Sequence, residues 1–88
     1  MTWILEWHDK ARRELCKLDH SIPETILCFF REQIMVDDDP RRFGKALRHE
    51  LKGLWRYRIG DYRAVCQIQD TRLVVLVLAV GHRRNIYQ

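Results

Sequence analysis

The 88 residues of this chain are 47% hydrophobic and 32% charged, which predicts one small globular domain over residues 1–88 and excludes a disordered tail or a fibrous repeat. The longest apolar run, 73–80, is far shorter than the roughly 20 residues of a membrane-spanning helix, so no membrane partner is expected. Three cysteines without paired spacing and the absence of a secretory leader pattern predict a cytoplasmic protein.

Charge is distributed unevenly along the chain. Residues 1–40 have five Lys or Arg and nine Asp or Glu, a net charge of −4. Residues 41–88 have eleven Lys or Arg and three Asp or Glu, a net charge of +8. A polyanion is therefore expected to bind the second half. The alternative is that these cations only form a solvated surface.

The first elements are a strand and a helix. Residues 2–7 alternate bulky with smaller or polar residues, which is typical of a short strand. Asp9 is expected to cap the helix that follows, because Ala11, Leu15 and Leu18 recur at helical spacing.

A second helix is predicted between Ser21 and Pro40. It begins at Ser21, because Ser-Ile-Pro-Glu has the S-x-x-E form of a capping box with proline in the first turn. It ends before Pro40, because a residue that precedes proline avoids the α conformation. Residues 41–53 can form either a short helix at 46–51 or a basic loop.

From residue 54 onward the apolar residues alternate with a period of two, which predicts strands. A two-residue Gly-Asp turn at 60–61 predicts a hairpin, and counting outward from it places Arg58 opposite Arg63. Arg56 shares their face. The other face is apolar and is expected to face the core; its members are Trp55, Tyr57, Ile59, Tyr62, Ala64, Cys66 and Ile68. The run at 73–80 predicts a central strand covered on most of both faces.

The three arginines of this hairpin indicate a phosphate-binding surface. Like charges directly opposite each other destabilise an antiparallel pair by a few tenths to about 1 kcal/mol, so Arg58 opposite Arg63 has no structural advantage. Guanidinium groups bind phosphate bidentately and stay charged at every relevant pH. Arg83 and Arg84 would add cations at the rim, and the ring of Tyr87 would stack on an unpaired base.

The same residues can support RNA cleavage without a metal. The 2′-OH of RNA attacks the adjacent phosphate when a base takes its proton, cations stabilise the phosphorane and an acid protonates the leaving oxygen. Arg58 and Arg63 suit the stabilising role, and Arg83 can donate to the leaving group. Since arginine stays protonated, His82 or Lys52 is favoured for proton transfer, with His49 a further titratable candidate. The other basic residues expected to bind RNA are Lys45, Arg48, Lys52, Arg56 and Arg84.

No cofactor or metal is expected. The sequence has no P-loop, GxSxG, GxGxxG or HExxH motif, and its histidines and cysteines have no zinc-ligand spacing. Core filling accounts for Cys16, Cys28 and Cys66.

The segment LKGLWRYRIGDYRAVCQI, followed by an apolar strand and VGHRRNIY, resembles the RelE/ParE superfamily of bacterial type II toxins. The resemblance covers essentially the whole chain and is closer to the RelE branch, ribosome-dependent mRNA interferases, than to the ParE branch, which inhibits DNA gyrase. It implies an α+β fold: a small, mostly antiparallel four-stranded sheet with two N-terminal helices packed on one face.

The resemblance also implies a site and partners. By position within the motifs, the family's catalytic basic residues would fall on Arg56, Arg58, Arg63 and Arg83, and its C-terminal tyrosine on Tyr87. The implied partners are the ribosome and mRNA, together with an acidic, RelB-like cognate antitoxin through which operator DNA would be bound only indirectly.

Several alternatives stay open at this point. The general base is not settled by the resemblance, because arginines stand where some relatives have lysines, while Glu50 is near the glutamate that YoeB-like relatives use. A gyrase inhibitor on the same scaffold is the second candidate function. A non-enzymatic module that only binds its antitoxin is the third.

Overall fold

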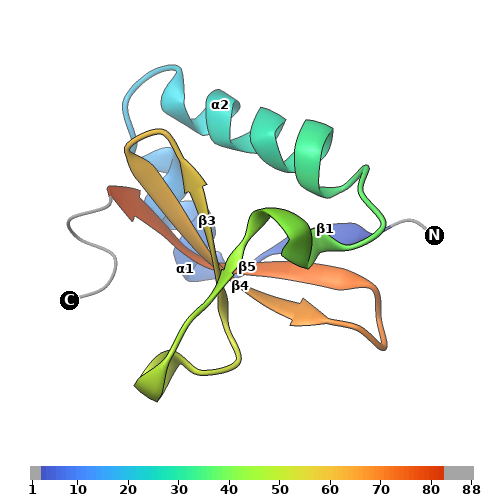
Figure 1. Cartoon of the computed structure of the whole chain (residues 1–88). Helices are drawn as coiled ribbons and strands as arrows, with labels where there is room; N and C mark the ends of the chain where they lie inside the picture. Colours follow the sequence, from blue (N-terminus) through green and yellow to red (C-terminus); the bar gives the residue numbers. More distant parts are fainter. Residues whose placement is uncertain (1–2, 83–88) are drawn as a thin grey trace.

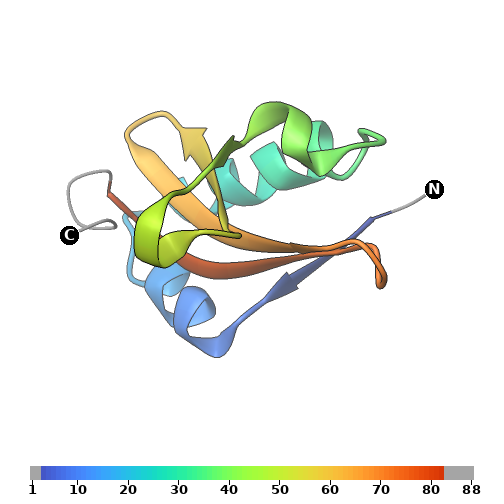
Figure 2. The same cartoon turned by 60° about the horizontal axis from the view of Figure 1, so that its bottom comes forward.

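A computed structural model describes residues 3–82, so the predictions for Arg83, Arg84 and Tyr87 lie outside the described residues. Five strands in this range form one sheet in the order β1-β5-β4-β3-β2. The strands are β1 Ile4–Trp7, β2 Lys45–Ala46, β3 Trp55–Ile59, β4 Tyr62–Gln69 and β5 Val74–His82. β1 runs parallel to β5, and the other neighbouring pairs are antiparallel, as Figures 1 and 2 show for the long β4–β5 pair.

The predicted α+β fold is confirmed, but the predicted number of four strands is wrong. The additional strand, β2, has only two residues and pairs with the first half of β3. A strand of two residues is too short to show a period of two in the sequence. The segment at 41–53 is thus mostly irregular, with β2 and two short 3₁₀ turns, η2 Pro40–Phe43 and η3 His49–Leu51.

Two helices precede the hairpin. They are α1 Asp9–Cys16 and α2 Ile22–Phe29, and a π-helical turn, η1 Phe30–Ile34, extends the second helix. The cap of α1 is His8 and not Asp9, because Nδ1 of His8 accepts a hydrogen bond from the Lys10 backbone N–H at 3.1 Å. None of the helices within residues 3–82 is long and apolar enough to cross a membrane.

The expected capping box at the start of α2 does not form. Ser21 is the N-cap residue, but its side chain makes no capping hydrogen bond. The reason is its backbone, with φ −88° and ψ −7°, since a capping side chain needs an extended conformation to reach the next N–H groups. Proline in the first turn is confirmed.

Both helices contribute to one hydrophobic core against one face of the sheet. Phe30 is fully buried at its centre and meets Trp7 and Tyr57 edge-to-face, with ring centroids 5.9 and 5.6 Å apart. The fully buried or nearly buried members of this core include Ala11, Leu15, Ile26, Phe30, Ile34, Tyr57, Ala64, Cys66, Val75, Val77 and Val80. Two other buried residues, Val65 and Val74, belong to the opposite face and are not part of this core.

The hairpin register predicted from the sequence is confirmed. Ile59 pairs with Tyr62, Arg58 with Arg63 and Tyr57 with Ala64. The alternation of β3 and β4 therefore points Tyr57 and Ala64 toward the helices and leaves the arginines on the other face.

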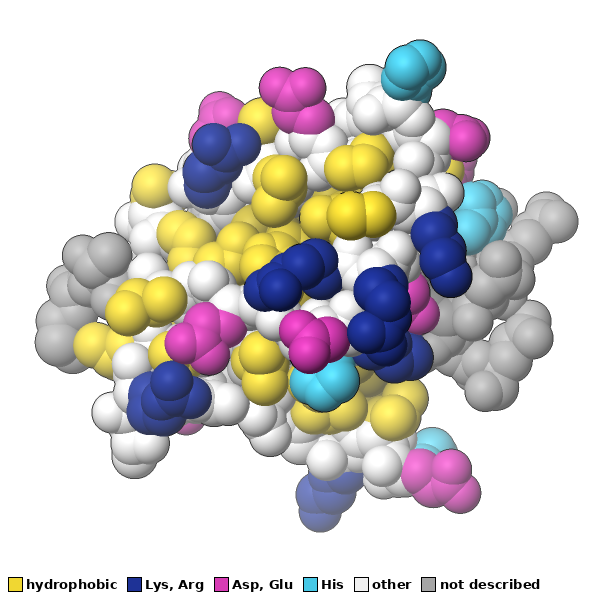
Figure 3. Space-filling model, turned by 180° about the vertical axis from the view of Figure 1, so that it is seen from behind, with side chains coloured by type: hydrophobic (Ala, Val, Ile, Leu, Met, Phe, Trp, Pro, Cys, Tyr) yellow, Lys and Arg dark blue, Asp and Glu magenta, His cyan; other side chains and the backbone are white. Residues whose placement is uncertain are grey.

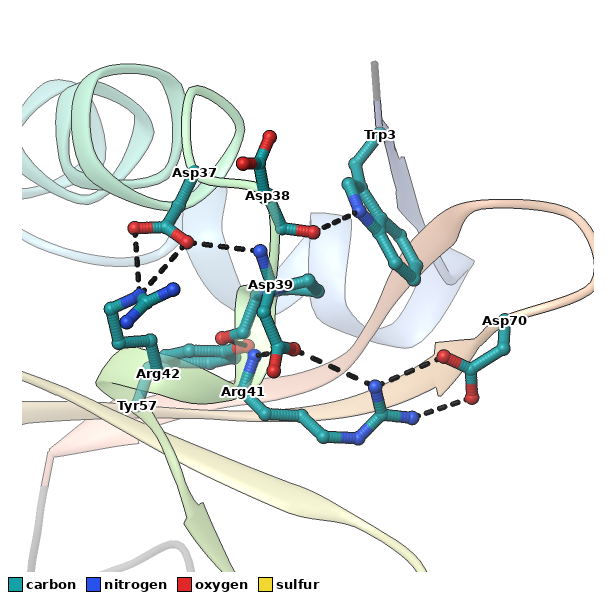
Figure 4. Close-up of polar contacts among 9 residues, drawn as sticks. Trp3, Asp37, Asp38, Asp39, Arg41, Arg42, Tyr57 and Asp70 are labelled. Atoms are coloured by element: carbon teal, nitrogen blue, oxygen red, sulfur yellow. Dashed lines mark hydrogen bonds and ion pairs between the residues drawn. The ribbon is translucent and has the colours of Figure 1, made fainter. Parts of the chain in front are cut away.

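A network of polar contacts fixes the segment that leads from α2 to β2 (Figure 4). The buried Tyr57 hydroxyl donates to the Pro40 carbonyl at 2.6 Å. The Arg41 guanidinium donates to both carboxylate oxygens of Asp70, at 3.0 and 2.5 Å, and lies 5.7 Å from the ring centroid of Trp55. The indole N–H of Trp3 donates to a main-chain carbonyl of the same segment at 3.1 Å. These contacts hold the short strand β2 beside β3.

Candidate nucleic-acid interface

Four basic residues from three adjacent strands share the face of the sheet that the helices leave uncovered. Arg58 in β3 is the direct partner of Arg63 in β4, and Lys45 in β2 is the direct partner of Arg56 in β3. Directly paired residues of antiparallel strands point to the same side, and so do residues two apart on one strand. Lys45, Arg56, Arg58 and Arg63 are therefore neighbours on one surface, here named the cation face.

Three members of the cation face lack an acidic partner within residues 3–82. Among residues 3–82, no carboxylate forms a salt bridge with Lys45, Arg56 or Arg58. The described hydrogen bond of Arg58 is a long one, 3.4 Å, from its Nε to the Gly60 carbonyl. Repulsion among Lys45, Arg56 and Arg58 is thus not offset by a salt bridge within the described part of the fold.

Several basic residues elsewhere in the described part of the chain are paired with acids. Arg41 and Arg42 pair with Asp70 and Asp37, and Arg72 pairs with Glu6. In the view from behind, Lys and Arg side chains lie among Asp and Glu side chains (Figure 3). This contrast separates the cation face from an ordinary solvated surface, where both signs of charge are interspersed.

Two of the three arginines of the cation face are partly embedded in the sheet surface. Arg56 and Arg63 are half-buried, and Val65, the direct partner of Arg56, is only 5% exposed. The Nε atom of Arg56 is buried and has no hydrogen-bond partner within the described range. We infer that the aliphatic part of this side chain lies along the sheet, which restricts the guanidinium before any ligand binds.

His82 lies on the opposite face of the sheet from the cation face. It pairs with Tyr62, and the two rings meet edge-to-face with centroids 5.6 Å apart. The ladder between β4 and β5 shifts at Leu78, which has no partner because Val65 pairs with Ala79 and Cys66 with Val77. This β-bulge reverses the facing of every later residue of β5, so the residue opposite Arg63 is Gly81. The structure does not bring His82 together with Arg58 and Arg63.

Comparison with known proteins places the chain in a family. The family model described as ParE toxin of type II toxin-antitoxin system, parDE, matches residues 5–87. The chain belongs to the RelE/ParE family of type II toxins. The RelG toxin of Mycobacterium tuberculosis is 37% identical over 90 aligned residues, which cover 100% of this chain and 99% of RelG. The RelE toxin of the same organism is 33% identical over 78 residues, which cover 89% of this chain and 78% of that protein.

A solved structure agrees with this assignment. The toxin superposes on a chain of the RelBE2 toxin-antitoxin complex of Mycobacterium tuberculosis with a TM-score of 0.86 and 33% identity. The superposition covers 97% of the toxin and 95% of that chain. The resemblance stated from the sequence motifs is thereby confirmed at the level of the family.

Two further residues predicted to bind RNA, Arg48 and Lys52, and the titratable candidate His49 lie on the connection between β2 and β3. Arg48, His49 and Lys52 are all exposed, with His49 inside η3 and the other two at its ends. A hydrogen bond from the Leu47 N–H to the Leu54 carbonyl, 3.0 Å, closes this connection. The structure therefore places these three side chains on a loop beside the cation face and not within its strands.

Lys45 is the residue whose position the sequence did not reveal. It was expected only as one of several RNA-binding residues, because nothing in the segment 41–53 predicts a strand. Pairing with Arg56 adds it to the cation face of the toxin. The sequence carries no signal for this pairing, because a contact between two strand residues eleven positions apart depends on tertiary structure.

Other chemistries find little support in the described part of the toxin. No group of three or more His, Cys, Asp or Glu residues within 3–82 could hold a metal ion. Cys66 is fully buried, and burial raises the pKa of its thiol, so it fills the core as an uncharged side chain. Burial likewise raises the pKa of Tyr57, whose hydroxyl stays protonated and donates to Pro40.

Proposed function

We propose that this toxin is a ribosome-dependent endoribonuclease that cleaves mRNA without a metal. The observation that carries the proposal is the pairing of Arg58 with Arg63 on the face that the helices leave uncovered. Two guanidinium groups held on adjacent strands provide bidentate donors for one phosphodiester. The absence of a described acid paired with Lys45, Arg56 or Arg58 leaves these charges available for an anionic ligand.

The proposed reaction is an intramolecular transesterification of the RNA backbone. The 2′ oxygen attacks the adjacent phosphorus, the bond to the 5′ oxygen breaks, and the products are a 2′,3′-cyclic phosphate and a 5′-OH. Arg58 and Arg63 bind the non-bridging oxygens and stabilise the charge that develops on the phosphorane. Their positions are set by the strand ladder, so little reorganisation is needed during the reaction.

We propose Lys52 rather than His82 as the group that takes the proton from the 2′-OH. His82 faces away from Arg58 and Arg63, which leaves Lys52 of the two favoured candidates for the proton acceptor. The roles that the sequence assigned to Arg83, as donor to the leaving oxygen, and to Tyr87, as a stacking platform for a base, remain part of the proposal.

The proposed partners are the ribosome, mRNA and an acidic antitoxin, all in the cytoplasm. The structural relative from Mycobacterium tuberculosis is itself a toxin-antitoxin complex. Residues 41–88 have a net charge of +8, which favours association with an acidic chain that would neutralise it. Operator DNA would be bound only through the antitoxin.

Inhibition of DNA gyrase is the second candidate function. It is favoured by the matching family model, which describes a ParE toxin. The mRNA-cleavage proposal is preferred because the two curated relatives are named RelG and RelE, and because the cation face is arranged for phosphate.

The test compares both activities in one set of variants. Purified toxin is added to translating ribosomes and the 5′ ends of the mRNA are mapped, while gyrase supercoiling is measured in parallel. Cuts inside translated codons are expected for the wild type and for Arg72→Gln, a control cation at the opposite end of the sheet, but at least about tenfold slower for Arg58→Gln and Arg63→Gln. Intact mRNA combined with inhibited supercoiling would establish the gyrase function. Intact mRNA without gyrase inhibition would leave only the non-enzymatic module.

A further inference from the structure

The cation face consists of two rows of basic residues. One row is the direct pair Arg58 and Arg63, and the other is the direct pair Lys45 and Arg56. Because Arg56 and Arg58 are two residues apart in β3, the rows are separated by about 6.6 to 6.8 Å along the strand. This separation is close to that of consecutive phosphates in an extended single strand of RNA.

We propose that Lys45 and Arg56 form a second phosphate subsite, which holds the phosphodiester adjacent to the one that is cleaved between Arg58 and Arg63. The inference rests on the proposed function and specifies how the substrate lies: an extended single strand of RNA whose backbone follows β3. The row of Lys45 and Arg56 contributes to binding, and the row of Arg58 and Arg63 acts on the reacting phosphate.

The pairing of Lys45 with Arg56 is the first observation behind this subsite. Two cations directly opposite each other destabilise a strand pair, and here the same arrangement occurs twice on one face. No acid within residues 3–82 forms a salt bridge with either residue. An anion bound between them would remove the repulsion that the described part of the fold leaves in place.

The restricted side chain of Arg56 and the fixed backbone of Lys45 are the second observation. The buried Nε of Arg56, without a described hydrogen-bond partner, keeps this guanidinium close to the sheet. The backbone around Lys45 is held on both sides, by a hydrogen bond from the Gly44 N–H to the Arg41 carbonyl at 3.1 Å and by the bond between Leu47 and Leu54. A cation on a fixed backbone loses less conformational freedom on binding than one on a free loop.

The experiment combines protein variants with a change in the RNA. Cleavage of ribosome-bound mRNA is measured at increasing toxin concentration for the wild type, Lys45→Gln, Lys45→Arg and the control Lys10→Gln, whose lysine pairs with Glu14 on α1. Each protein is tested on normal mRNA and on mRNA in which an uncharged methylphosphonate replaces the phosphate on the 5′ or on the 3′ side of the cleaved one.

The expected result is a coupling between Lys45 and one flanking phosphate. On normal mRNA, Lys45→Gln raises the half-saturating toxin concentration by about tenfold or more and leaves the maximal rate nearly unchanged, because a charge-assisted contact is lost from binding only. One of the two methylphosphonates has the same effect on the wild type and little further effect on Lys45→Gln. Lys45→Arg keeps the charge and behaves as the wild type does, and so does Lys10→Gln.

Three outcomes would overturn the subsite. The first is that the effects of Lys45→Gln and of both methylphosphonates are fully additive. The second is that Lys45→Gln leaves binding unchanged. The third is that Lys45→Arg loses the maximal rate, which would instead make the Lys45 amine a proton acceptor. In each of these the wild type still cleaves normal mRNA, so the proposed function stands. Absence of cleavage by the wild type would overturn the function and the subsite together.

Discussion

Arg58 and Arg63 are direct cross-strand partners beside the turn of the β3–β4 hairpin, on the face that the helices do not cover. The hairpin therefore holds two like charges at adjacent positions of a rigid ladder. In a purely structural hairpin this pair would reduce stability by a few tenths to about 1 kcal/mol. Proteins retain such local destabilisation at functional sites, and the stability gained when one of the two charges is removed can be measured.

Replacement of Arg58 by glutamine is expected to stabilise the fold while it removes activity. The side chain is exposed and its one described hydrogen bond is long, so little is lost, and relief of repulsion should add up to about 1 kcal/mol to the free energy of unfolding. Urea denaturation at low ionic strength measures this. Arg72→Gln is the matched control, because it removes an arginine that is paired with Glu6 and should give no gain. A loss of more than about 1 kcal/mol in Arg58→Gln would show that this residue has a structural role.

Replacement of Tyr57 by phenylalanine should destabilise the toxin by about 1 to 3 kcal/mol. The hydroxyl donates to the Pro40 carbonyl in a buried position, and the carbonyl would be left without this partner. Thermal unfolding compares this variant with Tyr62→Phe, whose hydroxyl makes no described hydrogen bond and whose removal should change stability by less than about 0.5 kcal/mol. Equal effects of the two changes would mean that the bond to Pro40 contributes nothing.

Gly44 is expected to tolerate no side chain. A Cβ at this position would lie 3.1 Å from Cε1 of Tyr57 and 3.3 Å from the Arg56 carbonyl oxygen, and both are fixed by the buried ring and the β3 backbone. Gly44→Ala should therefore lower the free energy of unfolding by about 1 to 3 kcal/mol and displace β2. Gly81→Ala is the control, since a Cβ there has no neighbour within 4 Å. The prediction fails if both alanine variants melt at the same temperature.

Acid should weaken the contacts that hold the segment before β2. The backbone N–H of Asp39, followed by the Arg42 side chain, lowers the pKa of Asp37, and the Arg41 guanidinium lowers the pKa of Asp70. A carboxyl whose pKa is lower in the folded state stabilises the fold fully above its unfolded pKa of about 4, and this contribution is lost as the pH falls through the folded value.

The melting temperature should thus decrease as the pH falls below about 4, and less steeply in the double variant Asp37→Asn with Asp70→Asn. The Asp70 carboxyl is solvent-exposed and that of Asp37 is partly exposed, so the difference should be modest and should shrink in high salt. Melting curves between neutral and acidic pH, recorded in low and high salt, measure it. Parallel curves for the wild type and the double variant would show that these ion pairs do not affect stability.

Much of the candidate site was predictable because its information is local. The Gly-Asp turn at 60–61 and the strict alternation on both sides of it fix the hairpin register, since a shift of one residue would move every apolar side chain out of the core. The same pattern places Arg58 opposite Arg63 and separates both from the core. The family motif adds roles for these residues but was not needed for their geometry.

Two features of the site depend on contacts between distant segments. Lys45 pairs with Arg56 only because Tyr57 and Arg41 hold the segment before β2 in place. A strand of two residues has too short a pattern to be predicted from the sequence. His82 leaves the cation face only because Leu78 forms a bulge in the ladder with β4.

By itself, then, the sequence determined the hairpin, its register and the side of the sheet on which its arginines lie, because turn chemistry and a period of two act between neighbouring residues. Tertiary structure alone decided that a lysine from β2 completes the cation face and that a histidine from β5 points away from it. Both outcomes depend on how strands remote in sequence pair, and a single unpaired residue in such a ladder reverses the facing of all that follow.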